Sequence, residues 1–283
     1  MSLDRDDSRR LALEHTHLQR QLGRSLRDLR EHTRMHTTEV AVRVKIDVDK
    51  LNRIERGQPP TYHELCAMLD AYGLLYDDWK PYLTRLHHIT QRGWWRGYGL
   101  PRGHFAGTEN DATLVREFQL GLVPEPLQTE PYIRVVLSAS RRGRHEQELA
   151  IRLRRQQRLT VDDPRRYHVI IDETALAVPL PDPAVARDQL RHILTMAALP
   201  TITVQVMLRR AGPHEGRKGT FMVLSFPDPE DRTLLYVPHV TGATCVDNQD
   251  DTAAAELLFQ HLSTLALTPT DSTRWIERLI AET

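Results

Sequence analysis

One stretch constrains the fold of this chain more than any other: residues 37–57, which read "TTEVAVRVKIDVDKLNRIERG". Its apolar residues recur at helical spacing in two short runs, and the terminal Gly57 is a natural helix stop. The small Ala41 allows two helices to approach closely. The stretch therefore predicts two short helices packed against each other, one from Thr37 to Val44 and one that starts after Asp47 and runs to Gly57. Their apolar side consists of Val40, Ala41, Val44, Ile46, Leu51 and Ile54.

The sequence on either side predicts further helices. Residues 17–33 carry leucines at helical spacing, with arginines between them. Asp47 stands where its carboxylate would cap the second helix of the central pair. Thr61 and Glu64 predict a capping box at the start of a fourth helix, and a fifth follows. Residues 1–88 are therefore predicted to form an all-α domain of five short helices.

The pattern changes after residue 88. Residues 89–111 are rich in glycine and aromatic side chains, which predicts a junction between two domains. Residues 112–283 mix helical periodicity with β-branched and aromatic runs, which predicts a mixed α/β domain with a small sheet. The expected strands include "RYHVIID", and three more are expected to be neighbours: "TITVQVML", "TFMVLSF" and "RTLLYVPHV".

Composition excludes several classes of protein. Lys+Arg and Asp+Glu both number 38, so any signal for nucleic acid must be local. Cys66 and Cys245 lie far apart, which favours free thiols in a reducing compartment. No apolar run approaches the roughly 20 residues that span a bilayer, and the first residues lack the apolar core of a signal peptide. We therefore expect a cytoplasmic protein without membrane segments.

The sequence contains no constellation typical of an enzyme. The pairs His15/His17 and His87/His88 lack further ligands at the spacing of a zinc site, and the cysteines do not cluster. The chain has no glycine-rich phosphate loop and no serine in a nucleophile elbow. We therefore predict no catalytic residues, no metal and no cofactor.

The stretch "LRDLREHTRMHTTEVAVRVKIDVDKLNRIERG" resembles the repressor-like helix-turn-helix family called Xre, and "RIERG" is its most specific part. The resemblance covers residues 18–75. It implies that the second helix of the central pair enters the major groove of DNA, and that Arg30 and Glu55 form a salt bridge. Arg34 and Lys45 stand where the family usually has glycine, at helix ends that favour left-handed backbone.

The resemblance also implies a set of DNA-binding residues. Arg53 is placed to donate two hydrogen bonds to guanine, and Asp49 to accept one from cytosine if its repulsion from phosphates is compensated. The carboxylate of Asp47 is expected to turn toward its own helix. Base-facing positions are Val48, Asp49, Asn52 and Arg53, and phosphate-facing positions are Thr37, Lys50 and Arg56. Alternatively, the domain keeps the fold and serves dimerisation only.

The remainder, from about residue 112, resembles the carboxy-terminal domain of unknown function in antitoxin-like actinobacterial regulators. Glu125 and Pro126 replace the usual glycine and leucine, and Pro238 stands where an acid is common. The combination implies a homodimeric transcription regulator that binds double-stranded DNA and senses a signal through its second domain. The alternative is a module that binds a small partner protein. The matching stretches include "LVPEPLQTEPYIRVVL", "IIDETAL", "DQLRHIL", "GTFMVLSF" and "LALTPTDSTRWIERL".

Several residues are candidates for binding a small-molecule effector or a partner protein. Trp94, Trp95 and Tyr98 in the junction either bind a ligand or pack between domains. Arg209 and Arg217 either bind a ligand or lie in a solvated hairpin loop together with Arg210 and Lys218. Asp172 and Glu173 are expected to end a strand and cap the following turn. The arginines of residues 141–158 favour a solvated or salt-bridged helix over a second nucleic-acid surface, and they leave a surface that an acidic partner protein could use.

Overall fold

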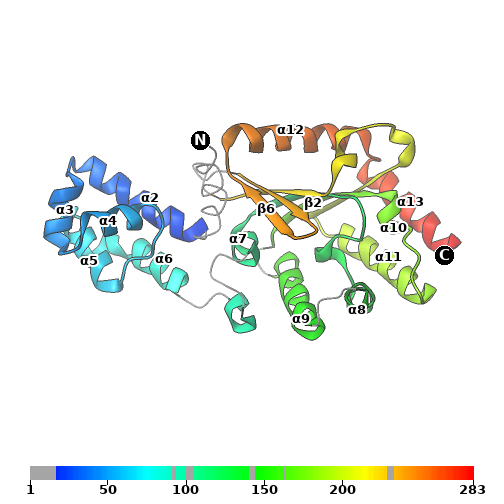
Figure 1. Ribbon diagram of the computed structural model, residues 1–283, viewed down its shortest axis with the longest axis horizontal. Coiled ribbons are helices and arrows are strands. Elements are labelled where there is room, and N and C mark those ends of the chain that lie inside the picture. Colours follow the sequence, from blue (N-terminus) through cyan, green and yellow to red (C-terminus); the bar gives the residue numbers. More distant parts are fainter. Residues whose placement is uncertain (1–16, 91–93, 100–104, 140–143, 162–163, 228–232) are drawn as a thin grey trace. The chain divides into compact units, whose positions relative to one another are not determined.

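The computed structural model describes residues 17–90, 94–99, 105–139, 144–161, 164–227 and 233–283. The chain divides into two compact units, Met1–Asp111 and Ala112–Thr283. The first is helical and the second contains a sheet with helices (Figure 1), so the predicted fold class is confirmed. The finer division at residues 88 and 111 remains a prediction.

The first unit begins with the expected helices. The helix at Thr37–Val44 has the predicted bounds, whereas the next one ends at Glu55 rather than at Gly57. The fifth predicted helix begins with one turn of 3₁₀ helix before it becomes an α-helix. The elements are α2 (His17–His32), α3 (Thr37–Val44), α4 (Val48–Glu55), α5 (Tyr62–Ala71), η1 (Tyr76–Trp79), α6 (Lys80–Thr90), η2 (Trp94–Tyr98) and α7 (Phe105–Asp111).

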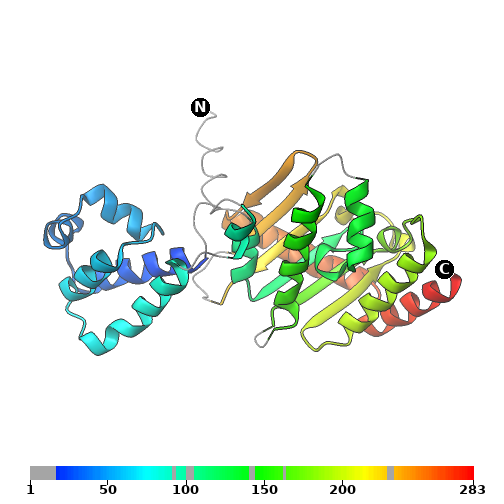
Figure 2. The same ribbon diagram turned by 90° about the horizontal axis from the view of Figure 1, so that it is seen from below.

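The core of this unit is built from one side of each of the helices α2 to α6. Burying apolar side chains of this size stabilises a fold by about 1.5–3 kcal/mol each, so this shared core fixes how the short helices pack. Figure 2 shows these helices packed side by side. Side chains that are at most 1% exposed include Leu22, Leu26, Val40, Leu51, Ile54, Leu65, Met68 and Leu69.

Three of the four helix-end features that the sequence predicts are present in the structure. Thr61 accepts a hydrogen bond from the backbone N–H of Glu64, and Glu64 accepts one from Thr61, which confirms the capping box. Arg34 and Lys45 have φ angles of 56° and 58°, which confirms the left-handed backbone expected there. Asp47 occupies the N-cap position of α4, but its side chain makes no capping hydrogen bond. The expected N-cap position of Asp47 is therefore confirmed, whereas the expected cap by its carboxylate is wrong.

The second unit contains a six-stranded mixed sheet in the order β3-β2-β1-β4-β5-β6. The pairs β1/β2 and β2/β3 are parallel, and the remaining pairs are antiparallel. The strands are β1 (Leu114–Gln119), β2 (Arg166–Asp172), β3 (Ile202–Met207), β4 (Phe221–Ser225), β5 (Leu234–His239) and β6 (Gly242–Val246).

The expectation that three consecutive strands are neighbours is wrong for β3. Strands β4 and β5 do pair, but β3 lies at the edge beyond β2 and β1. Strand β1 was not predicted because Arg116 and Glu117 interrupt its apolar run. Glu117 is nevertheless 1% exposed and accepts a hydrogen bond from Tyr167 at 2.6 Å. The short edge strand β6 begins with glycine and gave no strand signal either.

Helices cover both faces of this sheet. Figures 1 and 2 show α8, α9 and α11 on one face and α12 on the opposite face. Helix α13 lies beside the edge strand β3, where Ser272 accepts a hydrogen bond from the backbone of Val206 at 2.9 Å. The elements are η3 (Glu125–Leu127), α8 (Glu130–Ser138), α9 (His145–Gln156), η4 (Gln157–Leu159), α10 (Glu173–Leu176), α11 (Pro183–Ala197), η5 (Arg209–Ala211), η6 (Glu215–Lys218), α12 (Gln249–Leu265) and α13 (Pro269–Glu282).

The arginine-rich helix α9 is salt-bridged rather than simply solvated. Arg152 and Arg155 are each only 12% exposed, and both pair with Glu125 in η3. Glu125 is one of the residues that depart from the pattern of the similar domain, and it has two cationic partners here. Arg141 and Arg142 lie outside the described residues. Among the helices that the structure does describe, none is long and apolar enough to cross a membrane.

Candidate nucleic-acid interface

Helix α4 is anchored to its neighbours by one side. Leu51 and Ile54 are fully buried in the core shared with α2, α3 and α5. Residues three apart on a helix lie on the same face, so these two side chains fix which face of α4 is left outward. The helix is too short to be stable alone, so its orientation depends on this packing.

An ion pair fixes the carboxyl end of α4. Arg30 of α2 donates two hydrogen bonds to Glu55, from Nε to Oε1 at 2.6 Å and from Nη2 to Oε2 at 2.9 Å. Both side chains are largely buried, at 12% and 7% exposed. Arg30 also donates to the backbone oxygen of Met35 at 3.3 Å. The hydrogen bonds that Arg30 donates to Glu55 raise the pKa of Arg30 in spite of its burial. The structure thus brings Arg30 and Glu55 together as the resemblance implied.

The base-facing candidates lie on the opposite side of α4. Asp49 and Arg53 are exposed, and Val48 and Asn52 are half-buried. Positions 49, 52 and 53 are separated by three and four residues, which places them on one helical face. This face carries one carboxylate, one amide and one guanidinium. Such a set can donate to and accept from base edges in the major groove.

Gln58 orients the guanidinium of Arg53. Its side-chain oxygen accepts a hydrogen bond from Arg53 Nε at 2.9 Å. The two terminal nitrogens of Arg53 are the pair that a guanine edge would use, so this contact leaves the recognition donors available. Sequence analysis did not identify Gln58. Its position just beyond the helix end, five residues from Arg53, was the only available signal.

The phosphate-facing candidates are less uniform. Arg56 is exposed, and Thr37 is half-buried at the start of α3. Lys50 forms an ion pair with Glu64, which also belongs to the capping box of α5. Burial alone would raise the pKa of Glu64, but hydrogen bonds from Lys50 and Thr61 outweigh it and lower that pKa. The ammonium of Lys50 is therefore partly neutralised within the protein.

Two carboxylates stand near the start of α4. Asp47 and Asp49 are both exposed, and Asp47 makes no capping hydrogen bond. Negative charge in the first turn stabilises a helix through its dipole, which accounts for Asp49 without any role toward DNA. The same charges would repel phosphates, so they lower the positive potential of this surface.

Gly23 determines how closely α2 approaches α4. A methyl group added at this position would lie 2.6 Å from the carbonyl oxygen of Ile54 and 2.8 Å from that of Glu55. Backbone atoms cannot yield to such contacts without moving the helix. Sequence analysis did not identify this residue, although an isolated glycine inside a helix often marks close packing.

The aromatic candidates of the junction pack on one another. The rings of Trp94 and Trp95 are 6.1 Å apart at 88°, and those of Trp94 and Tyr98 are 5.9 Å apart at 78°. Trp95 is 8% exposed and covers Gly107. These contacts give each ring a structural role, and a role in ligand binding stays a prediction.

The basic loop is not the hairpin that was expected, because β3 and β4 are not neighbours. Arg209 pairs with Glu173 across 3.1 Å. Arg217 donates to the backbone oxygens of Gly212 and Arg209, each at 3.3 Å, and so holds the loop together. As expected, Asp172 ends β2 and accepts a hydrogen bond from the backbone of Thr174 at 3.0 Å.

Among the residues that the structure describes, no three His, Cys, Asp or Glu side chains form a cluster that could hold a metal ion. His15 and the side chains of His17 and His88 lie outside that description. Cys66 and Cys245 are both free thiols. Burial raises the pKa of Cys245 to about 11, so this thiol stays protonated at neutral pH.

Comparison with known families matches two regions of the chain. Residues 21–78 match a helix-turn-helix domain, and residues 103–278 match a domain of unknown function (DUF5753). Neither is described as an enzyme family. No curated protein and no solved structure matches the chain. The helix-turn-helix domain suggests DNA binding, whereas the role of the second domain is unknown. The chain belongs to the DUF5753 family and carries a helix-turn-helix domain before it.

Proposed function

We propose that this protein is a sequence-specific, DNA-binding transcription regulator of the Xre type. In this proposal α4 is the recognition helix, and α3 braces it against the DNA backbone. The observation that carries the proposal is the two-sided character of α4. Leu51, Ile54 and Glu55 are buried on one side, while Asp49 and Arg53 are exposed on the other.

Specific recognition is assigned mainly to Arg53. Its Nε is held by Gln58, which fixes the plane of the guanidinium before DNA arrives. A preorganised donor pair loses less side-chain entropy on binding, and a bidentate contact to guanine contributes about 1–3 kcal/mol of discrimination. Asn52 is proposed to contact a neighbouring base, and Thr37 and Arg56 to contact phosphates.

We propose a homodimer as the active form. One helix of eight residues contacts too few base pairs to select a site in a genome. Two copies of α4, about 34 Å apart on one face, would read two half-sites separated by one turn of DNA. The second unit is proposed to support dimerisation and to receive the signal that controls binding.

A fluorescence titration of the full chain tests the proposal. Labelled genomic fragments are first selected for binding, and the tightest fragment is then titrated at several salt concentrations. Wild-type protein is expected to bind with an affinity that falls as salt rises. The Arg53→Ala variant is expected to bind at least about tenfold more weakly. The Arg27→Ala variant is the matched control, because Arg27 is an exposed arginine of α2 that pairs with Glu31.

Asp47→Asn is expected to increase the affinity for DNA, whereas Arg53→Ala decreases it. This change removes a negative charge that caps no backbone group, so it should strengthen binding to any DNA at low salt and change specificity little. The proposal fails if no fragment binds in a salt-sensitive way. It also fails if Arg53→Ala binds the selected fragment as tightly as Arg27→Ala does.

A further inference from the structure

A small pocket lies where two parallel strands of the second unit end. Glu173 directly follows β2, and Leu208 directly follows β3. The last residues of these strands, Asp172 and Met207, are register partners, so both loops leave the sheet at the same level. Crevices at the carboxyl ends of parallel strands are the usual ligand sites of open α/β sheets.

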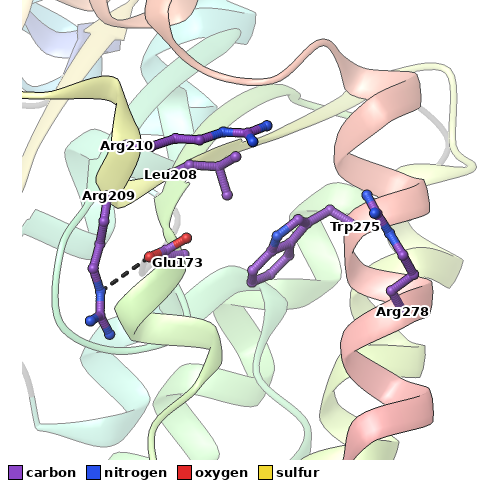
Figure 3. Close-up of a pocket in the computed structure, with 6 residues that line it drawn as sticks. All are labelled: Glu173, Leu208, Arg209, Arg210, Trp275 and Arg278. Atoms are coloured by element: carbon purple, nitrogen blue, oxygen red, sulfur yellow. Dashed lines mark ion pairs between the residues drawn. The ribbon is translucent and has the colours of Figure 1, made fainter.

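Six residues line this pocket, which has a volume of about 360 Å³. Figure 3 shows that they come from the two strand ends and from α13. The indole of Trp275 points from α13 toward Leu208 and Glu173, and Arg210 extends over Leu208. Trp275 and Arg278 are three residues apart, which places them on one face of α13. The lining residues are Glu173, Leu208, Arg209, Arg210, Trp275 and Arg278.

The charge of the lining favours an anion. The lining contains three guanidinium groups and one carboxylate, and that carboxylate is already paired with Arg209. Arg278 uses its Nε to donate to the backbone oxygen of Arg274 at 3.3 Å, which leaves its terminal nitrogens for another partner. Arg210 is exposed, and no carboxylate in the described part of the chain pairs with it. Guanidinium groups bind carboxylates and phosphates through paired hydrogen bonds.

The apolar part of the lining favours a flat ring. Trp275 is only partly exposed, and Leu208 is 8% exposed. An indole face and an aliphatic side chain offer a stacking surface for an aromatic ring, and arginine side chains also stack on such rings. Ligand sites typically range from about 300 to 1,000 Å³, so this pocket fits one ring with an acidic group rather than a large cofactor.

We propose that this pocket binds a small aromatic acid. The ring stacks on Trp275, and its carboxylate or phosphate is bound by Arg210 and Arg278. Glu173 holds Arg209 at the rim and repels ligands with a second acidic group on that side. The inference deepens the proposed function, from which it takes only the expectation that the second unit receives a signal.

Four probes of similar size separate the contributions of charge and ring. Benzoate carries both, benzamide removes the charge, cyclohexanecarboxylate removes the aromatic ring, and phenyl phosphate exchanges one acid for the other. Binding to the full chain is measured by calorimetry, without DNA, so that loss of DNA binding and loss of ligand binding are distinguished. Benzoate or phenyl phosphate is expected to bind with a Kd of about 10 mM or tighter, as its few atoms allow.

Removing either feature of the probe should weaken binding. Benzamide is expected to bind at least about tenfold more weakly than benzoate, because it loses a charge-assisted contact. Cyclohexanecarboxylate is expected to bind more weakly as well, and the Trp275→Leu variant should abolish this difference. Hydrogen exchange provides a second readout, because a bound acid ties α13 to the strand ends and should slow exchange of the α13 amides.

Protein variants localise the site. Arg210→Gln and Arg278→Gln are each expected to weaken benzoate binding about tenfold. Both residues are exposed, so these changes should leave the fold intact. Arg274→Gln is the matched control, because Arg274 is an exposed arginine of the same helix that pairs with Asp271 and does not line the pocket. The proposal is overturned if neither acid binds, if benzamide binds as well as benzoate, or if the control weakens binding as much as the other two variants.

Discussion

Arg30 of α2 and Glu55 of α4 are joined by two hydrogen bonds, at 2.6 and 2.9 Å. Glu55 is the last residue of α4, only two residues from Arg53. The ion pair therefore fixes the end of the helix on which the proposed recognition residues lie. A change in this pair should affect both the stability of the unit and the direction in which Arg53 points.

The Glu55→Gln variant should destabilise the first unit by about 3 kcal/mol, because it leaves the largely buried charge of Arg30 without its partner. Urea unfolding measures the change in the free energy of unfolding, with hydrogen exchange of the α2 and α4 amides as the readout. Glu39→Gln is the control, since it breaks an exposed pair with Arg43 and should cost less than about 1 kcal/mol. Equal losses in the two variants would show that burial of the Arg30 pair is unimportant.

Gly23→Ala should destabilise the same unit by about 1–3 kcal/mol, because its methyl group would collide with the backbone at the end of α4. In an ordinary helix interior this substitution is stabilising, so the sign of the change is diagnostic. Thermal unfolding measures it. Gly97→Ala serves as the comparison, because a methyl group there meets no atom of the described residues within 4 Å. A Gly23→Ala variant as stable as the wild type would contradict the packing of α2 on α4.

Lys45→Gly should stabilise the first unit by about 1 kcal/mol. Lys45 has φ 58° and ψ 45°, a left-handed conformation that costs a residue with a Cβ about 1–2 kcal/mol and costs glycine little. Part of this gain is offset by the greater freedom of glycine in the unfolded chain. Lys45→Ala isolates the backbone effect, because alanine removes the charge and keeps the Cβ. If alanine and glycine have the same effect on unfolding, backbone strain is not the cause.

The ion pair between Lys50 and Glu64 predicts a pH dependence. The pKa of Glu64 is lower in the folded protein than its usual value of 4.5. Its contribution to stability is therefore fully present above that value and is lost as pH falls through the lowered pKa. Glu64→Gln can still form the capping box but loses the charge. It should lower stability by about 0.5–1 kcal/mol at neutral pH.

Measuring urea unfolding of both proteins between neutral and acidic pH tests this linkage. The two stabilities should converge as pH falls below 4.5, because wild-type Glu64 becomes protonated there and then resembles glutamine. A difference that stays constant over the whole range would mean that the charge of Glu64 is not responsible. Glu39→Gln is a suitable control on α3, since that exposed carboxylate pairs with the exposed Arg43.

Much of the first unit could be predicted from sequence, because the local periodicity of apolar residues predicts short amphipathic helices. The bounds of α3, the capping box at Thr61 and the left-handed residue Lys45 all follow from local patterns. The role of Asp47 could not be predicted, since a residue at the N-cap position can leave its carboxylate in solvent. Gly23 acts through atoms more than thirty residues away, which no local pattern records.

Less of the second unit could be predicted, because strand order depends on contacts between distant segments. Strand β1 does not form an apolar run, because it contains the charged but buried Glu117. Strands β2 and β1 lie between β3 and β4 in the sheet. Because β1 was not predicted, the basic loop after β3 was interpreted as a hairpin. The pocket combines residues 173, 208–210, 275 and 278. Trp275 and Arg278 therefore gave no sign of their proximity to Arg209.

The most direct test of α4 as a recognition helix is methylation interference at guanine N7, which lies in the major groove. With the selected fragment and wild-type protein, methylation should block binding at two groups of guanines about 10 base pairs apart. With Arg53→Ala, the interference at one guanine in each group should disappear. Binding that is insensitive to N7 methylation, or a pattern unchanged by Arg53→Ala, would contradict the account.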